Sequence, residues 1–175
     1  MGQQTPARRL KLLAEAEGYI ELGMHDHALA SLDAIEEPGE VQFEVAFLRG
    51  EMYRNLGKHA KALEFLQTAY AERPDSVPLL MAMAWCYKRT NQLPRAIEMM
   101  ERAYRIEPKE AVVLYNLACY WSLAGNKTQA LSWLGRAIRM DKSYRDQVAT
   151  ETDFDLLRHD ADFQLIVREP ASESK

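Results

Sequence analysis

The chain has 175 residues, of which 47% are hydrophobic and 27% are charged, and its formal net charge is −4. This length favours one domain, and the apolar content is sufficient for a core. No stretch of the sequence is long and apolar enough to span a membrane. An acidic chain without a dense basic stripe is not expected to bind nucleic acid. Two cysteines, Cys86 and Cys119, cannot build a disulfide framework, so we expect a reduced, cytoplasmic protein, although their spacing alone does not exclude a bridge.

An alanine recurs every 34 residues, at Ala28, Ala62, Ala96 and Ala130. The positions around it recur with the same period. They are a small residue 12 positions earlier (Ala16, Gly50, Ala84, Ala118), an aromatic residue nine earlier (Tyr19, Tyr53, Tyr87, Trp121) and a large aliphatic residue four later (Leu32, Leu66, Met100, Leu134). Spacings of three, four and seven place side chains on one helical face. The pattern therefore predicts repeated helix pairs that approach closely at the small residues.

Turn and boundary residues recur in phase with these helices. Gly23, Gly57, Asn91 and Gly125 lie between the two helices of each pair, where a left-handed backbone ends a helix. Pro74 and Pro108 mark the point where one repeat passes to the next. Pro78 and Pro94 are expected in first helical turns, where a missing N–H costs little.

These residues resemble the tetratricopeptide repeat (TPR) family. The resemblance covers four repeats, at 9–42, 43–76, 77–110 and 111–144, after a flexible N-terminus at 1–8. It implies an all-α fold, a right-handed α-solenoid of stacked antiparallel helix pairs. Pro38 comes two residues early in the first repeat, so its second helix is expected to be short. Lys142 replaces the boundary proline of the fourth repeat, so we expect its last helix to run on.

Residues 145–168 are expected to form C-terminal capping helices. Thr152 with Asp155 has the spacing of a capping box, and Asp160 is a second candidate N-cap. The apolar residues of this segment, which are Phe154, Leu157, Phe163 and Ile166, can cover the exposed end of the stack. The alternative is a detachable segment that occupies the protein's own groove. The composition of residues 169–175 predicts a disordered tail.

The sequence contains no recognisable catalytic or cofactor motif. His25 and His27 do not have helical i, i+4 spacing, and no cysteine or acidic set completes a zinc site with them. The glycines are isolated rather than grouped in a phosphate-binding loop. We therefore expect a non-enzymatic protein with no cofactor and no metal.

In the TPR family the first helices line a concave groove, and the resemblance identifies the groove positions here. They are Glu17, Glu44, Phe47, Glu51, Arg54, Met81, Trp85, Lys88, Tyr115, Asn116 and Cys119. Trp85 is of the residue type most enriched at binding hot spots, so we expect it to contact a ligand. For Met81 the alternative is that its side chain packs between repeats and contacts no ligand. The glutamates form an acidic end, toward which basic residues of a ligand are expected to lie.

The resemblance implies an adaptor that binds a protein or peptide segment in this groove. Some TPR domains hold a chaperone's carboxylates with a lysine and an asparagine in the first repeat and an asparagine in the second. Leu13 and Glu17 stand at the first two positions and Glu51 at the third, which argues against that role. Two alternatives stay open. One is a structural subunit or self-assembling scaffold, because residues 1–42 and 145–175 are acidic while 77–144 are basic, and a homo-oligomer is then possible. The other is a secretion-type chaperone that masks an apolar segment.

Overall fold

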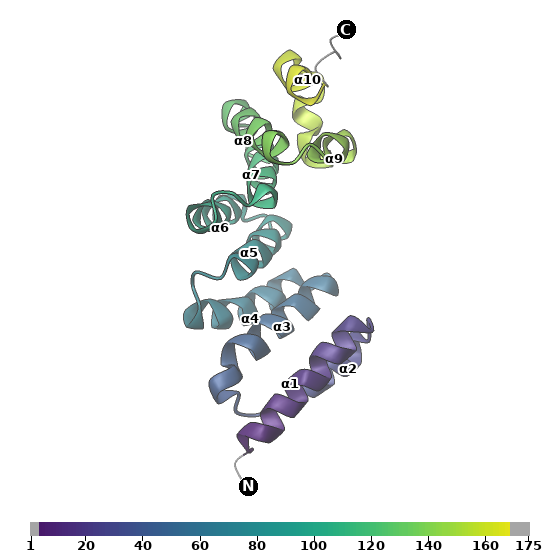
Figure 1. Cartoon of the computed structure of the whole chain (residues 1–175), viewed down its shortest axis with the longest axis vertical. Helices are drawn as coiled ribbons and strands as arrows, with labels where there is room; N and C mark the ends of the chain where they lie inside the picture. The colour runs from purple at the N-terminus through teal and green to yellow at the C-terminus, as the bar shows by residue number, and fades with distance from the viewer. Residues whose placement is uncertain (1–3, 169–175) are drawn as a thin grey trace. The chain divides into compact units, whose positions relative to one another are not determined.

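The computed structural model describes residues 4–168 (Figure 1), so the tail at 169–175 that we expected to be disordered lies outside the described residues. Within them, every regular element is a helix, as the sequence predicted. The chain forms two compact units, Met1–Thr90 and Asn91–Lys175. The boundary between the units falls inside the third predicted repeat, and the four repeat boundaries themselves stay a prediction.

Unit 1 consists of helix pairs joined by short turns (Figure 1). Its elements are α1 (Pro6–Glu21), α2 (His25–Asp33), the 3₁₀ turn η1 (Gly39–Val41), α3 (Gln42–Asn55), α4 (His59–Glu72) and α5 (Val77–Arg89). The helix α1 packs on α2, α3 packs on α4, and α5 packs on both α4 and α3. The helix α1 begins at Pro6, because the Thr5 side chain accepts a hydrogen bond from the Arg8 N–H and Pro6 suits the first turn.

The second helix of the first pair is short, as predicted. The helix α2 has 9 residues, whereas α4 has 14. Arg49 of α3 holds its carboxyl end: the guanidinium donates a 2.7 Å hydrogen bond to the Leu32 carbonyl and lies 3.3 Å from the Asp33 carboxylate. These contacts satisfy a carbonyl that a longer helix would have bonded internally.

Unit 2 contains α6 (Leu93–Ile106), α7 (Ala111–Leu123), α8 (Lys127–Met140), α9 (Tyr144–Thr150), the 3₁₀ helix η2 (Thr152–Leu157) and α10 (Ala161–Val167). The helix α7 packs against α6, α8 and η2. The expectation that the last helix of the fourth repeat runs on was wrong, because α8 ends at Met140. Asp141 has an extended backbone, and its side chain accepts a 2.9 Å hydrogen bond from the Ser143 N–H. This local turn ends the helix without a proline.

The predicted turn chemistry is confirmed. Gly57, which follows α3, and Asn91, which follows α5, have φ values of 72° and 58°, in the left-handed region. Pro78 and Pro94 both lie in first helical turns.

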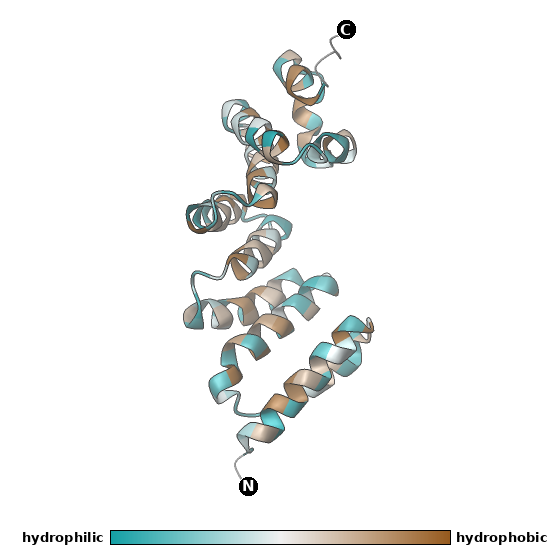
Figure 2. Ribbon diagram, in the orientation of Figure 1, coloured by the Kyte–Doolittle hydropathy of each residue, from teal (hydrophilic) through white to brown (hydrophobic). Residues whose placement is uncertain are grey.

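The core is built from the small and aliphatic residues of the repeating pattern. Ala28, Ala62, Ala96 and Ala130 are all fully buried. Along α1, polar and apolar residues alternate in Figure 2, as expected of a helix that buries one face. Gly50 of α3 lies against α4: a Cβ atom there would come 2.6 Å from Leu66 Cγ and 3.4 Å from the Ala62 carbonyl oxygen.

The C-terminal elements α9, η2 and α10 pack on α7 and α8 within unit 2. Phe154 and Phe163 are almost completely buried, with ring centroids 5.6 Å apart, and Ile166 is half-buried. Asp160 caps α10 as predicted, by accepting hydrogen bonds from the N–H groups of Asp162 and Phe163. The predicted capping box at Thr152 was wrong, because the Glu151 side chain, one residue earlier, accepts from the Asp153 N–H instead.

We predict that Gly50→Ala lowers the free energy of unfolding by about 1–3 kcal/mol, because the added methyl group meets the fully buried Leu66. Gly18→Ala is the matched control, since a Cβ there meets nothing within 4 Å. Removing a helical glycine should raise stability at that site by about 0.5–1 kcal/mol. Chemical denaturation measures both values, and a stabilising Gly50→Ala would contradict the close approach of α3 and α4.

We also predict that Phe154→Ala lowers the free energy of unfolding by about 3–5 kcal/mol, because a buried aromatic ring leaves a cavity. Leu156→Ala in the same 3₁₀ helix is the control: its side chain is 75% exposed, so its effect should stay within about 0.5 kcal/mol. Similar small effects for both variants would mean that the C-terminal segment detaches readily.

Candidate protein-interaction surface

Seven of the eleven groove positions fall on two neighbouring helices of unit 1. The helix α3 carries Glu44, Phe47, Glu51 and Arg54, and α5 carries Met81, Trp85 and Lys88. Spacings of three and four put each set on one side of its helix, and α3 contacts α5 directly. We call these seven residues the α3–α5 face. Glu17 lies on α1 and is exposed.

Trp85 is the main apolar feature of the α3–α5 face. Its side chain is 40% exposed, while Met81, one helical turn earlier, is half-buried. Lys88 Nζ lies 5.5 Å from the Trp85 ring centroid, and the guanidinium carbon of Arg89 lies 6.0 Å from it. An indole flanked by two cations offers a large apolar contact with positive charge at its border.

The glutamates of this face already have partners in the chain, which the sequence analysis did not foresee. Glu51 accepts two 2.8 Å hydrogen bonds from Arg54, and this pairing raises the pKa of Arg54. Glu44 accepts a 2.7 Å hydrogen bond from Arg73. The expectation that these two carboxylates attract basic residues of a ligand therefore needs revision, because each is neutralised locally.

Phe47 belongs to a small stack beside the Glu44 pair. Its ring is parallel to that of Phe43 at 5.8 Å, and the Arg73 guanidinium lies 4.2 Å from the Phe43 centroid. Phe47 is half-buried, so only part of its ring is available to another molecule.

A basic pocket lies at the end of α5, and sequence reasoning missed it. It has a volume of about 450 Å³ and is lined by residues 57–61, Arg89 and Thr90. Three of its lining residues are cationic, Lys58, Lys61 and Arg89, and Lys61 Nζ lies 4.2 Å from the Tyr53 ring centroid. Burial, followed by the charges of Arg89 and Arg54, lowers the pKa of His59. The available signal was the Lys58–Lys61 pair, but its place beside Arg89 depends on how the α3–α4 turn packs.

The groove positions of the fourth repeat, by contrast, are covered. Tyr115 and Cys119 are 6% and 2% exposed, and Asn116 is half-buried. The Tyr115 ring stacks on Tyr144 at 4.4 Å and meets the edge of Phe154 at 6.0 Å. The protein's own C-terminal segment thus occupies the side of α7 that we had expected to face a ligand.

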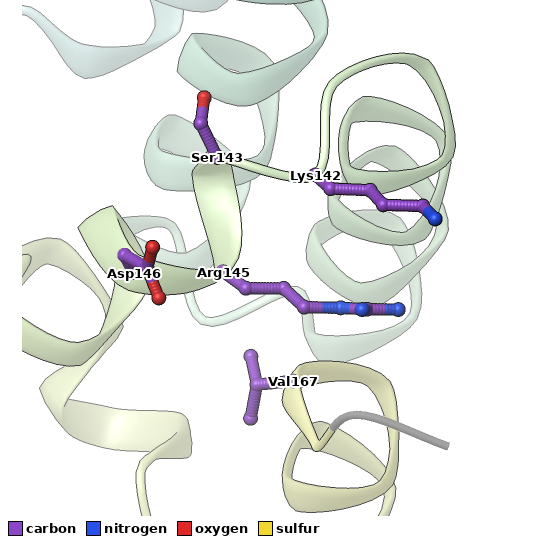
Figure 3. Close-up of a pocket in the computed structure, with 5 residues that line it drawn as sticks. All are labelled: Lys142, Ser143, Arg145, Asp146 and Val167. Carbon is purple, nitrogen blue, oxygen red and sulfur yellow. The ribbon is translucent and has the colours of Figure 1, made fainter. Parts of the chain in front are cut away.

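Two of the pockets in unit 2 differ in their lining. One, of about 430 Å³, is apolar and is lined by Leu93, Pro94, Ile97, Trp121 and Ala124. The other, of about 330 Å³, is polar (Figure 3): the side chains of Lys142 and Arg145 extend in the same direction, away from Asp146. Because its lining includes both signs of charge, the second pocket does not define one class of ligand.

Among the described residues, one group has the geometry to hold a metal ion, Cys119 with Glu151 and Asp153. The other cysteine, Cys86, is fully buried in unit 1, and burial raises its pKa to about 11, so its thiol is protonated at neutral pH. Neither cysteine forms a disulfide bond. In the part of the chain that the structure describes, no helix is both long and apolar enough to cross a membrane.

Two family models, both described as tetratricopeptide repeat, match residues 13–77 and 55–103. No curated protein matches the sequence. Among solved structures, MamA from Desulfovibrio magneticus RS-1 is 18% identical, with a TM-score of 0.71 over 77% of this chain and 76% of that one. YrrB is 16% identical, with a TM-score of 0.73 over 82% and 75% of the two chains.

A thermophilic TPR protein from Thermus thermophilus is 21% identical, with a TM-score of 0.63 over 81% of this chain and 79% of that one. At these identities the likeness shows the fold, and it agrees with the helix pairs and in-phase turns described above. The chain belongs to the tetratricopeptide repeat family, whose repeats form protein–protein interaction modules that are typically non-catalytic.

Proposed function

We propose that this protein is a non-enzymatic adaptor that binds a segment of a partner protein on the α3–α5 face of unit 1. The observation that carries the proposal is Trp85, a large aromatic side chain left 40% exposed on a helix whose neighbouring positions are buried. Leaving this much indole in water is unfavourable, and burying it against a partner recovers that free energy.

The chemistry around Trp85 defines the ligand further. An apolar side chain of the partner would lie on the indole, and an acidic residue would lie toward Arg89, Lys58 and Lys61 in the adjoining pocket. An extended or helical segment can present an apolar side chain to Trp85 and an acidic side chain to the adjoining pocket at the same time. YrrB, which has a similar fold, is described as a TPR protein with an unusual peptide-binding site, and this supports a peptide ligand here.

The proposal includes a cytoplasmic location, in keeping with two cysteines that are not in disulfide bonds, and it needs no cofactor, nucleic acid or membrane. Its rivals are a structural subunit or self-assembling scaffold and a secretion-type chaperone. Affinity capture with the full chain, followed by calorimetry with the captured partner and light scattering after size exclusion, tests it. A defined partner bound by monomeric protein supports the adaptor, whereas a stable oligomer with no partner favours the scaffold.

We predict that Trp85→Ala weakens binding of the captured partner by about 2 kcal/mol or more, as for a hot-spot aromatic residue. Leu56→Ala is the control, because Leu56 lies in the same unit and is also 40% exposed but follows α3 in the turn. Circular dichroism checks that both variants are folded. A loss below about 0.5 kcal/mol for Trp85→Ala would remove this residue from the binding site.

We predict that Lys61→Gln weakens binding by about 0.2–1 kcal/mol at low salt and makes the affinity less dependent on ionic strength, because an exposed charge at the rim is screened. Lys109→Gln, an exposed lysine of unit 2, should change neither quantity. Calorimetry at two salt concentrations measures both, and equal salt dependence of the two variants would show that the basic pocket does not face the ligand.

A further inference from the structure

The C-terminal segment brings two carboxylates to a thiol on α7. Glu151 and Asp153 lie where α9 passes to η2, and one ligand atom from each lies within 4.8 Å of the other and of Cys119 Sγ. Cys119 is 2% exposed and Asp153 is 7% exposed. Glu151 is half-buried. Carboxylates held this close and partly shielded from water repel each other when both are ionised. A cation between them would relieve that repulsion.

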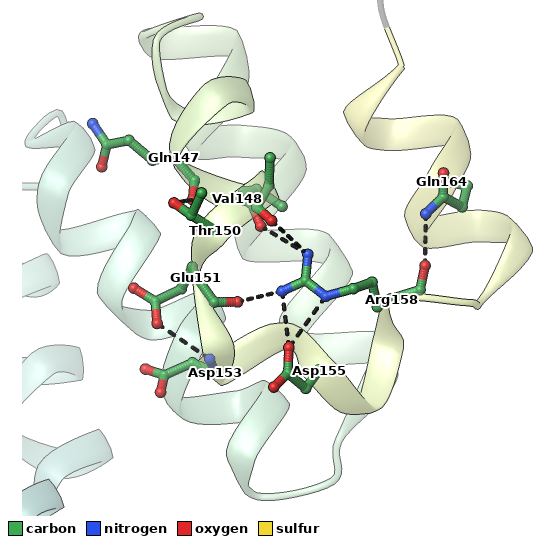
Figure 4. Close-up of polar contacts among 9 residues, drawn as sticks. Gln147, Val148, Thr150, Glu151, Asp153, Asp155, Arg158 and Gln164 are labelled. Carbon is green, nitrogen blue, oxygen red and sulfur yellow. Dashed lines mark hydrogen bonds and ion pairs between the residues drawn. The ribbon is translucent and has the colours of Figure 1, made fainter.

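The backbone that carries the two carboxylates is held by side-chain contacts. Glu151 Oε1 accepts a 3.2 Å hydrogen bond from the Asp153 N–H. Arg158 donates to the backbone carbonyls of Ala149 and Glu151 at 2.9 and 2.8 Å, and to the Asp155 carboxylate at 2.9 Å. In Figure 4 the carboxylates of Glu151 and Asp153 lie on the side of this turn away from the Arg158 guanidinium. These contacts therefore order the backbone that carries both carboxylates, and the Asp153 N–H holds the Glu151 carboxylate.

A second feature points to the same place. Tyr115 precedes Cys119 by one helical turn on α7 and is 6% exposed, yet its hydroxyl oxygen has no hydrogen-bond partner. A buried hydroxyl without a partner is rare in folded proteins. Tyr115 and Cys119 lie on the same side of α7, and the Tyr115 ring meets that of Phe154, the residue after Asp153, with their centroids 6.0 Å apart.

We propose that Cys119, Glu151 and Asp153 bind a divalent transition-metal ion, with Zn²⁺ as the best fit, and that the Tyr115 hydroxyl faces the fourth position. A thiolate with two carboxylates suits Zn²⁺, whereas Mg²⁺ and Ca²⁺ prefer oxygen ligands alone. Tetrahedral zinc places its ligand atoms roughly 3.4–3.6 Å apart, so these side chains need only a small inward movement. The ion would link Cys119 of α7 to Glu151 and Asp153 of the C-terminal segment, on the side of α7 that carries Tyr115.

Calorimetry with ZnCl₂ tests the proposal on the full chain, purified without a histidine tag. We expect one ion per chain, with affinity reduced at least tenfold in Cys119→Ser and in Asp153→Asn. Cys86→Ser is the matched control, because Cys86 is equally buried but lies in unit 1, and its affinity should equal that of the unaltered protein. Zn²⁺ should also raise the Tm of the unaltered protein and not that of Asp153→Asn.

Co²⁺ gives an independent readout, because a thiolate ligand produces an intense charge-transfer absorption that oxygen ligands do not. This band should appear with the unaltered protein and with Cys86→Ser, and it decides the question even if Cys119→Ser fails to fold. Absence of the band, no binding of Zn²⁺, or equal binding by Asp153→Asn would overturn the proposal. Partner binding on unit 1 is measured separately, so either proposal can fail while the other stands.

Discussion

The close approach of paired helices at small residues is the constraint on which the rest of this structure depends. At Gly50 the helices α3 and α4 leave no room for a methyl group, and the recurring alanines are fully buried. Interiors packed at this density cannot take larger side chains at these positions. The aromatic residues are therefore placed at the borders of the contacts, where Tyr53 and Phe65 stack at 5.3 Å. Trp85, on the α3–α5 face, is not covered fully and stays 40% exposed.

The same constraint explains how the two ends of the α3–α5 face differ in charge. Toward Phe47, Glu44 and Arg73 neutralise each other across two helices. Toward the end of α5, where Arg54 pairs with Glu51, Arg89 lines the same pocket as Lys58 of the α3–α4 turn and Lys61 in the first turn of α4. The helix register that buries the alanines also sets which charges meet, so the electrostatic character of the face is a consequence of core packing.

The sequence was sufficient to predict the features that depend on neighbouring residues or on the 34-residue period. The turn at Asn91, the first-turn prolines and the Asp160 cap each depend on residues within a few positions of one another, and all are confirmed. The predictions were wrong where alternative hydrogen bonds compete for a helix end, or where contacts between residues far apart in the sequence determine the structure. Asp141 ended a helix by an alternative hydrogen bond, Glu151 displaced Thr152 as a cap, and Tyr115 was covered by residues that follow it by about one repeat. No pattern in a single sequence shows which of several carboxylates an arginine will meet, so the pairs of Glu44 and Glu51 were not foreseen.

Because the chain is synthesised from its N-terminus, the side of α7 that carries Tyr115 is covered only after α7 itself has been made. The helices α7 and α8 are adjacent in the sequence and can pair as soon as both leave the ribosome, because their contacts are local. Tyr144, Phe154 and Phe163 emerge only later. Until then the side of α7 that carries Tyr115 and Cys119 faces water, and such transient apolar surface is where nascent chains associate wrongly. The last residues of unit 2 to be made thus determine how long its helices need protection during biosynthesis.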